Sequence, residues 1–438
     1  MGPTPPARDD ALVRAIGPRQ LTAAIVNATI GAGIFVLPAL VAANVGAAAP
    51  FAFLVCAAII ALIGVALAMA GSRVTLTGGI YAYVEVAFGP YVGLLAGVVL
   101  WLSAIAAAAG IATALLDQVG ALAPLVNGAP ARLLLLAMML SALAALNMRG
   151  VRIGTRVIEA ITAIKLAPLL VFVAAGVLLI DWPAIGWPAA PTAEALGRSV
   201  LLLIFAYTGV EMALAPSGEI REPARTVPRA ILLALALVTT FYVAIQLVAQ
   251  AALGPRLAQE TAAPLAQAAG RFLGRAGLTL MLAGAVCSMF GYLCSDMLCM
   301  PRTIYAFARD GFLPAVFARI HPTWRTPAVA IWTNAAIVLL FASSQTFQAL
   351  AIVSNVGTLL LYLLCCGAAL ELARRDVRMA DAPFTFPGAW LAPAAGATLV
   401  VWILSTATAR EFAVTGGVLA AATLAYVVRK RRQFSQSA

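Results

Sequence analysis

Apolar stretches of about 20 residues recur along the whole chain and are separated by short polar segments. An α-helix rises about 1.5 Å per residue, so a stretch of this length can cross a hydrocarbon core of about 30 Å. Polar loops are predicted between the stretches, and those at 72–89, 217–228, 307–326 and 371–387 carry most of the charge. The pattern predicts twelve spanning helices, at 19–45, 49–71, 90–120, 131–148, 157–180, 198–216, 228–253, 275–306, 327–344, 347–370, 388–407 and 412–429.

The first predicted span is interrupted at its middle by Gly31 and Gly33. Lipid offers no partner to backbone N–H and C=O groups. A break at this depth is therefore tolerated only where those groups line a cavity or meet protein. Residues 30–34 are thus a candidate ligand cradle. The alternative is an unbroken helix in which the two glycines allow close helix packing.

The sixth predicted span repeats this arrangement. Gly31 is followed by Pro38, and Gly209 is followed by Pro216, each time seven residues later. Five spans separate the two interruptions, so the two helices would cross the membrane in opposite senses. This is typical of an inverted repeat of five plus five spans, although a glycine-rich chain can produce one such pair by chance.

Composition agrees with a membrane protein. Of the 438 residues, 63% are hydrophobic and 10% are charged, which leaves no soluble domain of useful size. The polar, proline-rich start does not resemble a cleavable signal peptide. An all-α polytopic fold is predicted, with a cytoplasmic segment at 1–18, five-helix repeats at 19–180 and 198–370, two further helices at 388–429 and a basic tail at 430–438.

The net charge of +11 follows the predicted topology. Six of the 28 Lys and Arg residues fall in outer segments, Lys165 lies within a span, and the other 21 fall in inner segments. This satisfies the positive-inside rule, so we expect a protein of the inner (plasma) membrane with both termini in the cytoplasm. The charge therefore does not indicate a nucleic-acid partner. The run Arg429-Lys430-Arg431-Arg432 is interpreted as a stop-transfer flank, with binding of anionic membrane lipid as the alternative.

The sequence predicts no metal site and no cofactor. The six cysteines all lie in apolar spans without metal-ligand spacing and are interpreted as small buried residues. The single histidine, His321, lies in a loop beside Pro322. A nucleotide-binding P-loop is absent.

Several motifs occur in order along the chain. The first is Ile30-Gly31-Ala32-Gly33-Ile34-Phe35 with Pro38. The others are Gly78-Gly79-Ile80-Tyr81-Ala82-Tyr83 with Phe88-Gly89-Pro90, Phe205-Ala206-Tyr207-Thr208-Gly209-Val210-Glu211 with Gly218-Glu219 and Pro228-Arg229-Ala230, Pro301-Arg302 with Tyr305-Ala306-Phe307-Ala308-Arg309-Asp310-Gly311, and Thr326-Pro327. In this order the motifs resemble the amino acid, polyamine and organocation (APC) superfamily, and most closely the bacterial amino acid permeases. The resemblance covers residues 19–370 and implies a LeuT-like fold, in which two inverted five-helix repeats precede two more helices.

This resemblance implies that an amino acid binds at the two breaks. The substrate carboxylate would meet backbone N–H groups of the first break, at the positive end of a half-helix. The substrate ammonium would meet carbonyl groups of Ile30 and of the second break. The residues expected at these contacts are Ile30, Gly31, Ala32, Gly33, Ala206, Thr208 and Gly209.

The same resemblance implies roles for side chains around the substrate. Phe205 takes the place of an aromatic gate, with a core or lipid-facing phenylalanine as the alternative. In the third span Ser103, Ala104 and Ala108, which follow Trp101, are expected to line the side-chain pocket. Their small size favours an apolar or modest-sized substrate side chain. Close helix packing would explain the same residues.

Lys165 is the only lysine in the predicted spans. A charge at that depth costs at least about 2.5 kcal/mol on insertion scales, so we expect it to have a function. In resembling transporters a lysine of the fifth span replaces a bound cation between the first and eighth spans. A lysine removed from water also releases its proton more readily. Lys165 is therefore the predicted proton-coupling residue, with a structural lysine bonded to backbone carbonyls or reaching a membrane surface as the alternative.

Asp296 departs from the motif pattern, because some relatives carry an aromatic or apolar residue at this place. It is expected to contact a substrate amine, to pair with Lys165 or to transfer protons. The alternative is a position in the inner vestibule, beside Arg302. If Asp296 reaches the pocket, a cationic amino acid, an amine or a polyamine becomes a candidate substrate. Glu211 is expected to hold the second break by hydrogen bonds or to carry a proton.

The expected function is secondary active transport of an amino acid by alternating access, coupled to protons or working by exchange, with no enzymatic activity. A sensor or channel that binds amino acids without transport shares all of these motifs and remains an alternative. An intramembrane enzyme is disfavoured, because the predicted spans hold no histidine and few acids from which a catalytic group could be built.

Overall fold

The computed structural model describes residues 16–74, 76, 79–123, 125, 128–149, 155–180, 190–213, 220–309, 311–379 and 383–437. In this part of the chain the only pairing of extended backbone is one bridge between Ile16 and Ile220. The short helices are α1 (Pro18–Thr29), α2 (Gly33–Val45), η1 (Gly46–Ala48), α4 (Ile80–Phe88), α8 (Ala193–Tyr207), α9 (Val210–Ala213), η4 (Gly254–Gln259) and η5 (Ala315–Ala318). The remaining helices are α3 (Ala49–Arg73), α5 (Pro90–Leu122), α6 (Ala129–Met148), α7 (Thr155–Leu179), α10 (Pro223–Leu253), α11 (Pro264–Arg309), α12 (Ala328–Ser344), α13 (Phe347–Arg374), α14 (Leu391–Ser405) and α15 (Ala409–Ser437).

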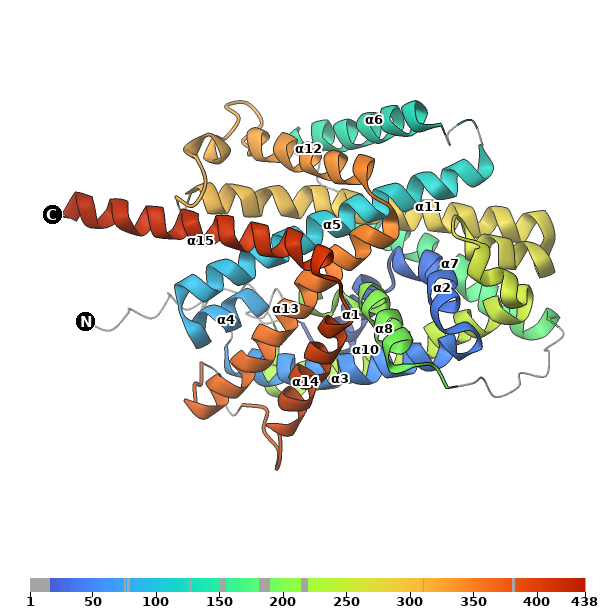
Figure 1. Cartoon of the computed structure of the whole chain (residues 1–438), viewed down its shortest axis with the longest axis horizontal. Coiled ribbons are helices and arrows are strands. Elements are labelled where there is room, and N and C mark those ends of the chain that lie inside the picture. Colours follow the sequence, from blue (N-terminus) through green and yellow to red (C-terminus); the bar gives the residue numbers. More distant parts are fainter. Residues whose placement is uncertain are drawn as a thin grey trace.

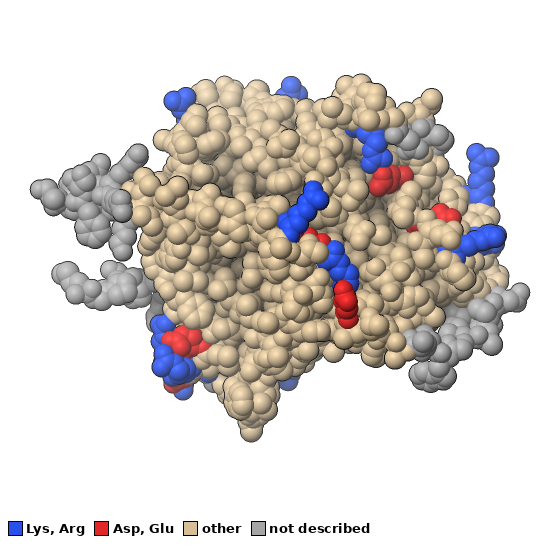
Figure 2. Space-filling model, viewed as in Figure 1, with Lys and Arg blue, Asp and Glu red and all other residues tan. Residues whose placement is uncertain are grey.

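The predicted class, an all-α polytopic membrane protein, is confirmed for the described residues. By length and composition, seven helical stretches of these residues can cross a membrane, and three shorter apolar helices accompany them. Figure 2 shows broad uncharged areas on one face, with charged side chains gathered in a few small clusters. The number of twelve spans stays a prediction. The seven stretches are Gly33–Arg73, Pro90–Ala121, Ala129–Met148, Pro223–Gln259, Pro264–Arg309, Phe347–Arg374 and Ala409–Val428.

Helices α2 and α8 form the centre of the molecule. Consecutive residues of both helices are buried, as expected for helices that are apolar on every side. They pack against each other, and α3, α10, α11 and α13 lie around them. Figure 1 shows the long helices α5, α11 and α15 running alongside one another, with α6 and α12 outside them. The two short central helices are therefore shielded from lipid by longer ones.

The first interruption predicted from the glycines is present. Helix α1 ends at Thr29 and α2 begins at Gly33, so residues 30–32 are not helical. The last helical bond of α1 runs from the Ile30 N–H to the Val26 carbonyl, at 2.9 Å. Pro38 lies inside α2, which continues past it to Val45. The chain therefore changes direction at the glycines and not at the proline.

The second interruption is also present, and it touches the first. Helix α8 ends at Tyr207 and α9 begins at Val210. Gly209 between them has a φ of +121°, and a Cβ atom placed on it would lie 2.8 Å from the carbonyl carbon and oxygen of Ala28 in α1. A Cβ on Gly33 would likewise lie 3.3 Å from the Cα of Ala206. The two breaks are thus in direct backbone contact, which only glycine permits at Gly209.

One predicted loop is wrong. The loop expected at 72–89 contains α4, which lies between Gly79 and Gly89, both at positive φ, and packs on α5. The span start expected at 275 agrees with the structure, because Gly274 (φ +61°, ψ −152°) is not helical and separates two helices within the range given for α11. Helix α15 runs to Ser437, through the tail expected at 430–438. The motif residues Gly78, Pro216, Gly218, Glu219 and Asp310 and the segment 1–15 lie outside the described residues.

We expect Gly209→Ala to lower the thermal unfolding midpoint of the protein in detergent. The substitution places a Cβ against the Ala28 backbone at a φ of +121°, a sparsely populated backbone region that costs an L-residue roughly 1–3 kcal/mol before the clash is counted. Gly416→Ala is the matched control, because Gly416 is helical and a Cβ atom placed on it would meet nothing within 4 Å. The control should keep the midpoint or raise it, because alanine is favoured over glycine in a helix by up to about 1 kcal/mol. Equal midpoints for the two variants would contradict this account of the break.

Candidate functional site

A cavity of about 360 Å³ lies where the two breaks meet. The breaks and the helix ends beside them contribute Asn27, Ala28, Gly31, Thr208, Gly209 and Glu211 to its wall, and α7 contributes Lys165. Helix α5 supplies small and apolar residues, and α11 and α13 supply most of the polar ones. The interrupted backbone therefore faces a cavity and protein, as the cost of unpaired peptide groups in lipid requires.

The cavity brings together only part of the predicted site. It is lined by Gly31, Ser103, Ala104, Lys165, Thr208, Gly209, Glu211 and Asp296. The other predicted residues do not line it and are buried in helix packing: Ile30, Ala32, Gly33, Ala108, Phe205 and Ala206. Among the described residues the N–H of Gly31 donates to no backbone carbonyl, which leaves a donor at the cavity wall.

Tyr242 on α10 joins the two breaks, and sequence reasoning missed it. Its hydroxyl donates to the carbonyl oxygens of Thr29 at 2.9 Å and of Ala206 at 3.1 Å. The ring is fully buried and packs edge-on against Phe53 and Tyr207. Two carbonyl groups freed by the breaks thus share one buried donor. The signal in the sequence is only a tyrosine in an apolar span, which does not say what its hydroxyl meets.

Glu211 holds the second break by hydrogen bonds, one of the two roles expected for it. The Gly209 N–H donates to both carboxylate oxygens, at 3.1 Å each. The Tyr362 hydroxyl of α13 donates to the same carboxylate at 2.8 Å. Glu211 therefore fixes the unwound segment to α13 and still lines the cavity.

Lys165 bonds to the first break. Its Nζ donates to the carbonyl oxygen of Asn27 at 2.6 Å and so connects α7 with the last turn of α1. It forms no ion pair with any described residue. The pairing between Lys165 and Asp296 that was one of the expected arrangements is therefore wrong for this structure, because a backbone carbonyl takes the ammonium instead.

Asp296 lies in the wall of the same cavity as Gly31 and Gly209, with a side chain 7% exposed. The fully buried amide of Asn334 on α12 interacts with its carboxylate. No ion pair to Arg302 is found among the described residues, although the expected vestibular position would allow one. The acid thus stands at the cavity with one neutral partner.

Two serine hydroxyls in the wall have no partner. Ser103 on α5 and Ser288 on α11 are 6% and 4% exposed, and neither Oγ makes a hydrogen bond with a described residue. Buried hydroxyls are normally satisfied, so these two are available to a bound molecule or to water. Tyr292, Ser295, Ser354 and Thr358 complete a wall that is more polar than the small residues of α5 alone predicted.

The opposite side of the breaks is packed shut. Phe205 makes an edge-on contact with Phe347 of α13, with ring centroids 5.4 Å apart. A Cβ on Gly33 would lie 3.1 Å from the Phe205 ring, so no space remains between α2 and α8. The cavity therefore lies on the side of the breaks where α1 and the C-terminal half of α11 run, and Phe205 lies in the packed region on the other side.

Broken helices that meet at a polar cavity inside an apolar helical bundle define a membrane transport protein of the permease class. The chain belongs to the amino acid permease family, whose model matches residues 16–428. The resemblance noted from the motifs is thereby confirmed.

Relatives of this chain are transporters. It is 26% identical over 420 residues to the methylthioribose transporter of Bacillus subtilis (strain 168). This alignment covers 91% of this chain and 89% of that transporter. It is 27% identical over 383 residues to the serine/threonine exchanger SteT of the same organism, in an alignment that covers 84% of this chain and 85% of that exchanger. It is 30% identical over 402 residues to the chloroplastic cationic amino acid transporter 9 of Arabidopsis thaliana, covering 87% and 70%. The family and these names indicate a transporter and not an enzyme.

We expect Tyr242→Phe to weaken substrate binding and to lower stability. The change leaves the Thr29 and Ala206 carbonyls without their donor, at a cost of about 1–3 kcal/mol for buried groups. Tyr207→Phe is the matched control, because the Tyr207 hydroxyl bonds to Phe53 and Thr239, away from the breaks. Thermal melting and binding of labelled substrate should show a stability loss in both variants and an affinity loss in Tyr242→Phe alone. Equal affinity in the two variants would exclude a role of Tyr242 in shaping the site.

Proposed function

We propose that this permease is a secondary active transporter whose substrate is an amino acid bound between the two helix breaks. The convergence of both breaks on one polar cavity carries this proposal. The Gly31 N–H lies at the start of α2, where the helix dipole favours a carboxylate. Thr208, Gly209 and the Glu211 carboxylate line the same cavity, where the carboxylate favours an ammonium group.

The same arrangement suits alternating access in a LeuT-like fold of twelve spans. The broken helices belong to the first and sixth predicted spans, which cross the membrane in opposite senses. The charge distribution assigns the α1 side to the cytoplasm, so the cavity faces inward while the Phe205 and Phe347 rings close the outer side. Phe205 thus acts as the outer gate, and its rotation away from Phe347 opens the second half of the transport cycle.

The walls of the cavity favour a substrate with a polar or cationic side chain. Asp296 and the unpartnered hydroxyls of Ser103 and Ser288 need hydrogen-bond donors or acceptors when water leaves. A hydroxyl or amine on the substrate supplies them, whereas an aliphatic side chain leaves them unpaired. A serine/threonine exchanger and a cationic amino acid transporter are among the relatives.

Lys165 is the proposed coupling residue. Its ammonium occupies a position between α7 and the first break, where it holds the Asn27 carbonyl. Loss of its proton removes this charge-assisted bond, and the attachment of α1 to α7 weakens. Proton movement and the position of α1 are linked in this way.

The test is uptake of labelled amino acids into proteoliposomes that contain the purified protein. The panel includes aliphatic, hydroxylated and basic amino acids, with an inside-alkaline pH gradient, with no gradient, and with unlabelled substrate inside. We expect accumulation of a hydroxylated or basic amino acid under the gradient, or exchange against internal substrate. Absence of both uptake and exchange across the panel overturns the proposed function.

Two variants of Lys165 distinguish a role in proton coupling from a purely structural role in the same uptake assay. Lys165→Ala should abolish accumulation under the gradient while leaving substrate binding measurable. Lys165→Arg keeps a cationic donor for the Asn27 carbonyl but does not release a proton, so accumulation should be lost there too. Accumulation restored by arginine would show that the lysine is structural.

A further inference from the structure

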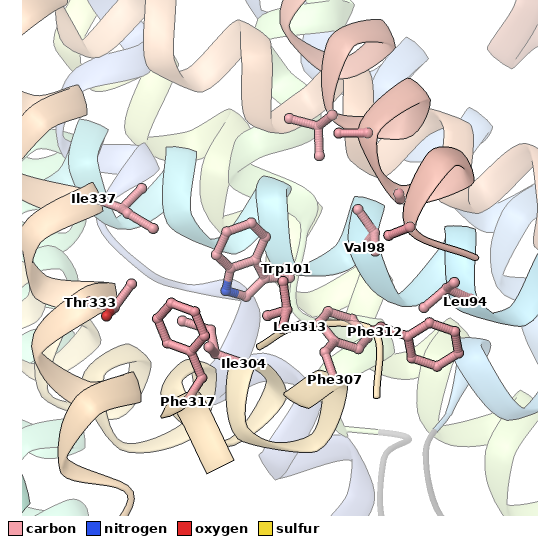
Figure 3. Close-up of a pocket in the computed structure, with 14 residues that line it drawn as sticks. Leu94, Val98, Trp101, Ile304, Phe307, Phe312, Leu313, Phe317, Thr333 and Ile337 are labelled. Carbon is pink, nitrogen blue, oxygen red and sulfur yellow. The ribbon is translucent and has the colours of Figure 1, made fainter. Parts of the chain in front are cut away.

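A second cavity, of about 290 Å³, lies outside the site described above. It is enclosed by α5, α11, α12, α15 and the segment after α11, and its wall is almost entirely apolar. Figure 3 shows Trp101 at its centre, with Ile337, Thr333 and Phe317 on one side and Val98 and Leu94 on the other. We call this cavity the apolar slot. Two of its walls, α5 and α11, are also walls of the polar cavity.

The slot lies at the boundary between protein and lipid. Its outer wall is α15, and only 6% of the apolar window Ala409–Val428 is buried inside the protein. This wall is made of the small side chains Ala421, Ala422 and Ala425 with Val418. Lipid therefore surrounds the helix that closes the slot.

The slot is elongated along the spanning helices. Its wall on α5 runs from Leu94 to Trp101 and its wall on α15 from Val418 to Ala425, seven residues in each case, or about 10 Å of helix. The hydroxyls of Tyr91 on α5 and Thr423 on α15 form a hydrogen bond of 3.0 Å, and the ring centroids of Tyr91 and Tyr426 lie 4.9 Å apart. The Leu94 end of one wall thus lies at the Ala425 end of the other. Trp101 ends the α5 wall and lies at the centre of the slot, between this end and Ile337 of α12. A slot with this direction fits a hydrocarbon chain that runs parallel to the bilayer normal.

Positive charge follows the Leu94 end of the slot. In the sequence, Arg429, Lys430, Arg431 and Arg432 come four to seven residues after Ala425, and the backbone of α15 stays helical through them. The run therefore begins about 6 Å beyond the slot along the helix axis. Basic clusters directly after a spanning helix attract anionic lipid, at about 1 kcal/mol per Lys or Arg.

We propose that the apolar slot binds an acyl chain of an anionic phospholipid whose headgroup lies at the basic run of α15. The chain enters beside Leu94 and Ala425, extends along α5 and contacts Trp101. It completes the packing between α15 and the helices α5 and α11. This assignment does not depend on the proposed substrate or coupling.

Quenching of Trp101 fluorescence by lipids with brominated acyl chains tests the proposal in the full-length protein. The protein is reconstituted with brominated phosphatidylglycerol or with phosphatidylcholine that carries the same chains. The difference between the wild type and Trp101→Phe gives the Trp101 component. We expect half-maximal quenching at a several-fold lower mole fraction of phosphatidylglycerol than of phosphatidylcholine.

Matched variants test whether the slot and the basic run at 429–432 are responsible for the quenching. Ala422→Phe fills the slot and should remove the Trp101 component, whereas Ala420→Phe on the exposed side of the same helix should keep it. After replacement of residues 429–432 by glutamine, the two lipids should reach half-maximal quenching at the same mole fraction. Retention of quenching in Ala422→Phe, or equal quenching by both lipids in the wild type, overturns the proposal. Because the readout is fluorescence, it is independent of whether amino acid uptake is observed.

Discussion

The structure depends on one constraint: peptide groups freed inside an apolar bundle must find partners that lipid does not offer. Two helices are interrupted, at residues 30–32 and at Thr208 and Gly209, and their breaks touch. Side chains from α7, α9 and α10 satisfy them. The Tyr242 hydroxyl takes one carbonyl from each break, Lys165 takes a carbonyl of α1, and Glu211 takes the Gly209 N–H.

This set of bonds also explains why the centre of the molecule can hold a polar cavity. The supporting donors come from α7 and α10, and Glu211 is fixed to α13 through Tyr362, so the breaks are held from several directions. On one side the packing of Phe205 on Phe347 leaves no space. On the other side the backbone, Asp296 and two unpartnered serines remain available to a ligand. An asymmetric site of this kind suits a permease that exposes its substrate to one side at a time.

The sequence predicted the breaks because glycine at the middle of an apolar span is a local signal, and Gly209 is present where its φ and its contact with Ala28 require it. Partners of the breaks were harder to predict, because they depend on which helices pack together. The sequence around Tyr242 does not indicate that α10 lies beside both breaks. Lys165 was correctly recognised as unusual, but its bond to the Asn27 carbonyl, in place of Asp296, depends on tertiary distances. Helix α4 was missed because polar residues around it resemble a loop.

Cys299 gives the most direct measurement of whether the cavity at the breaks is the transport site. It lines the cavity and is exposed, whereas Cys56, Cys365 and Cys366 are buried. The expectation that all six cysteines are buried is therefore wrong for Cys299. In a variant that keeps Cys299 as its only cysteine, the rate of labelling by a membrane-impermeant maleimide is followed at increasing substrate concentration. The account predicts that labelling slows as substrate fills the site, with half-protection at the concentration that half-saturates uptake. A labelling rate that stays constant at concentrations that saturate uptake would contradict it.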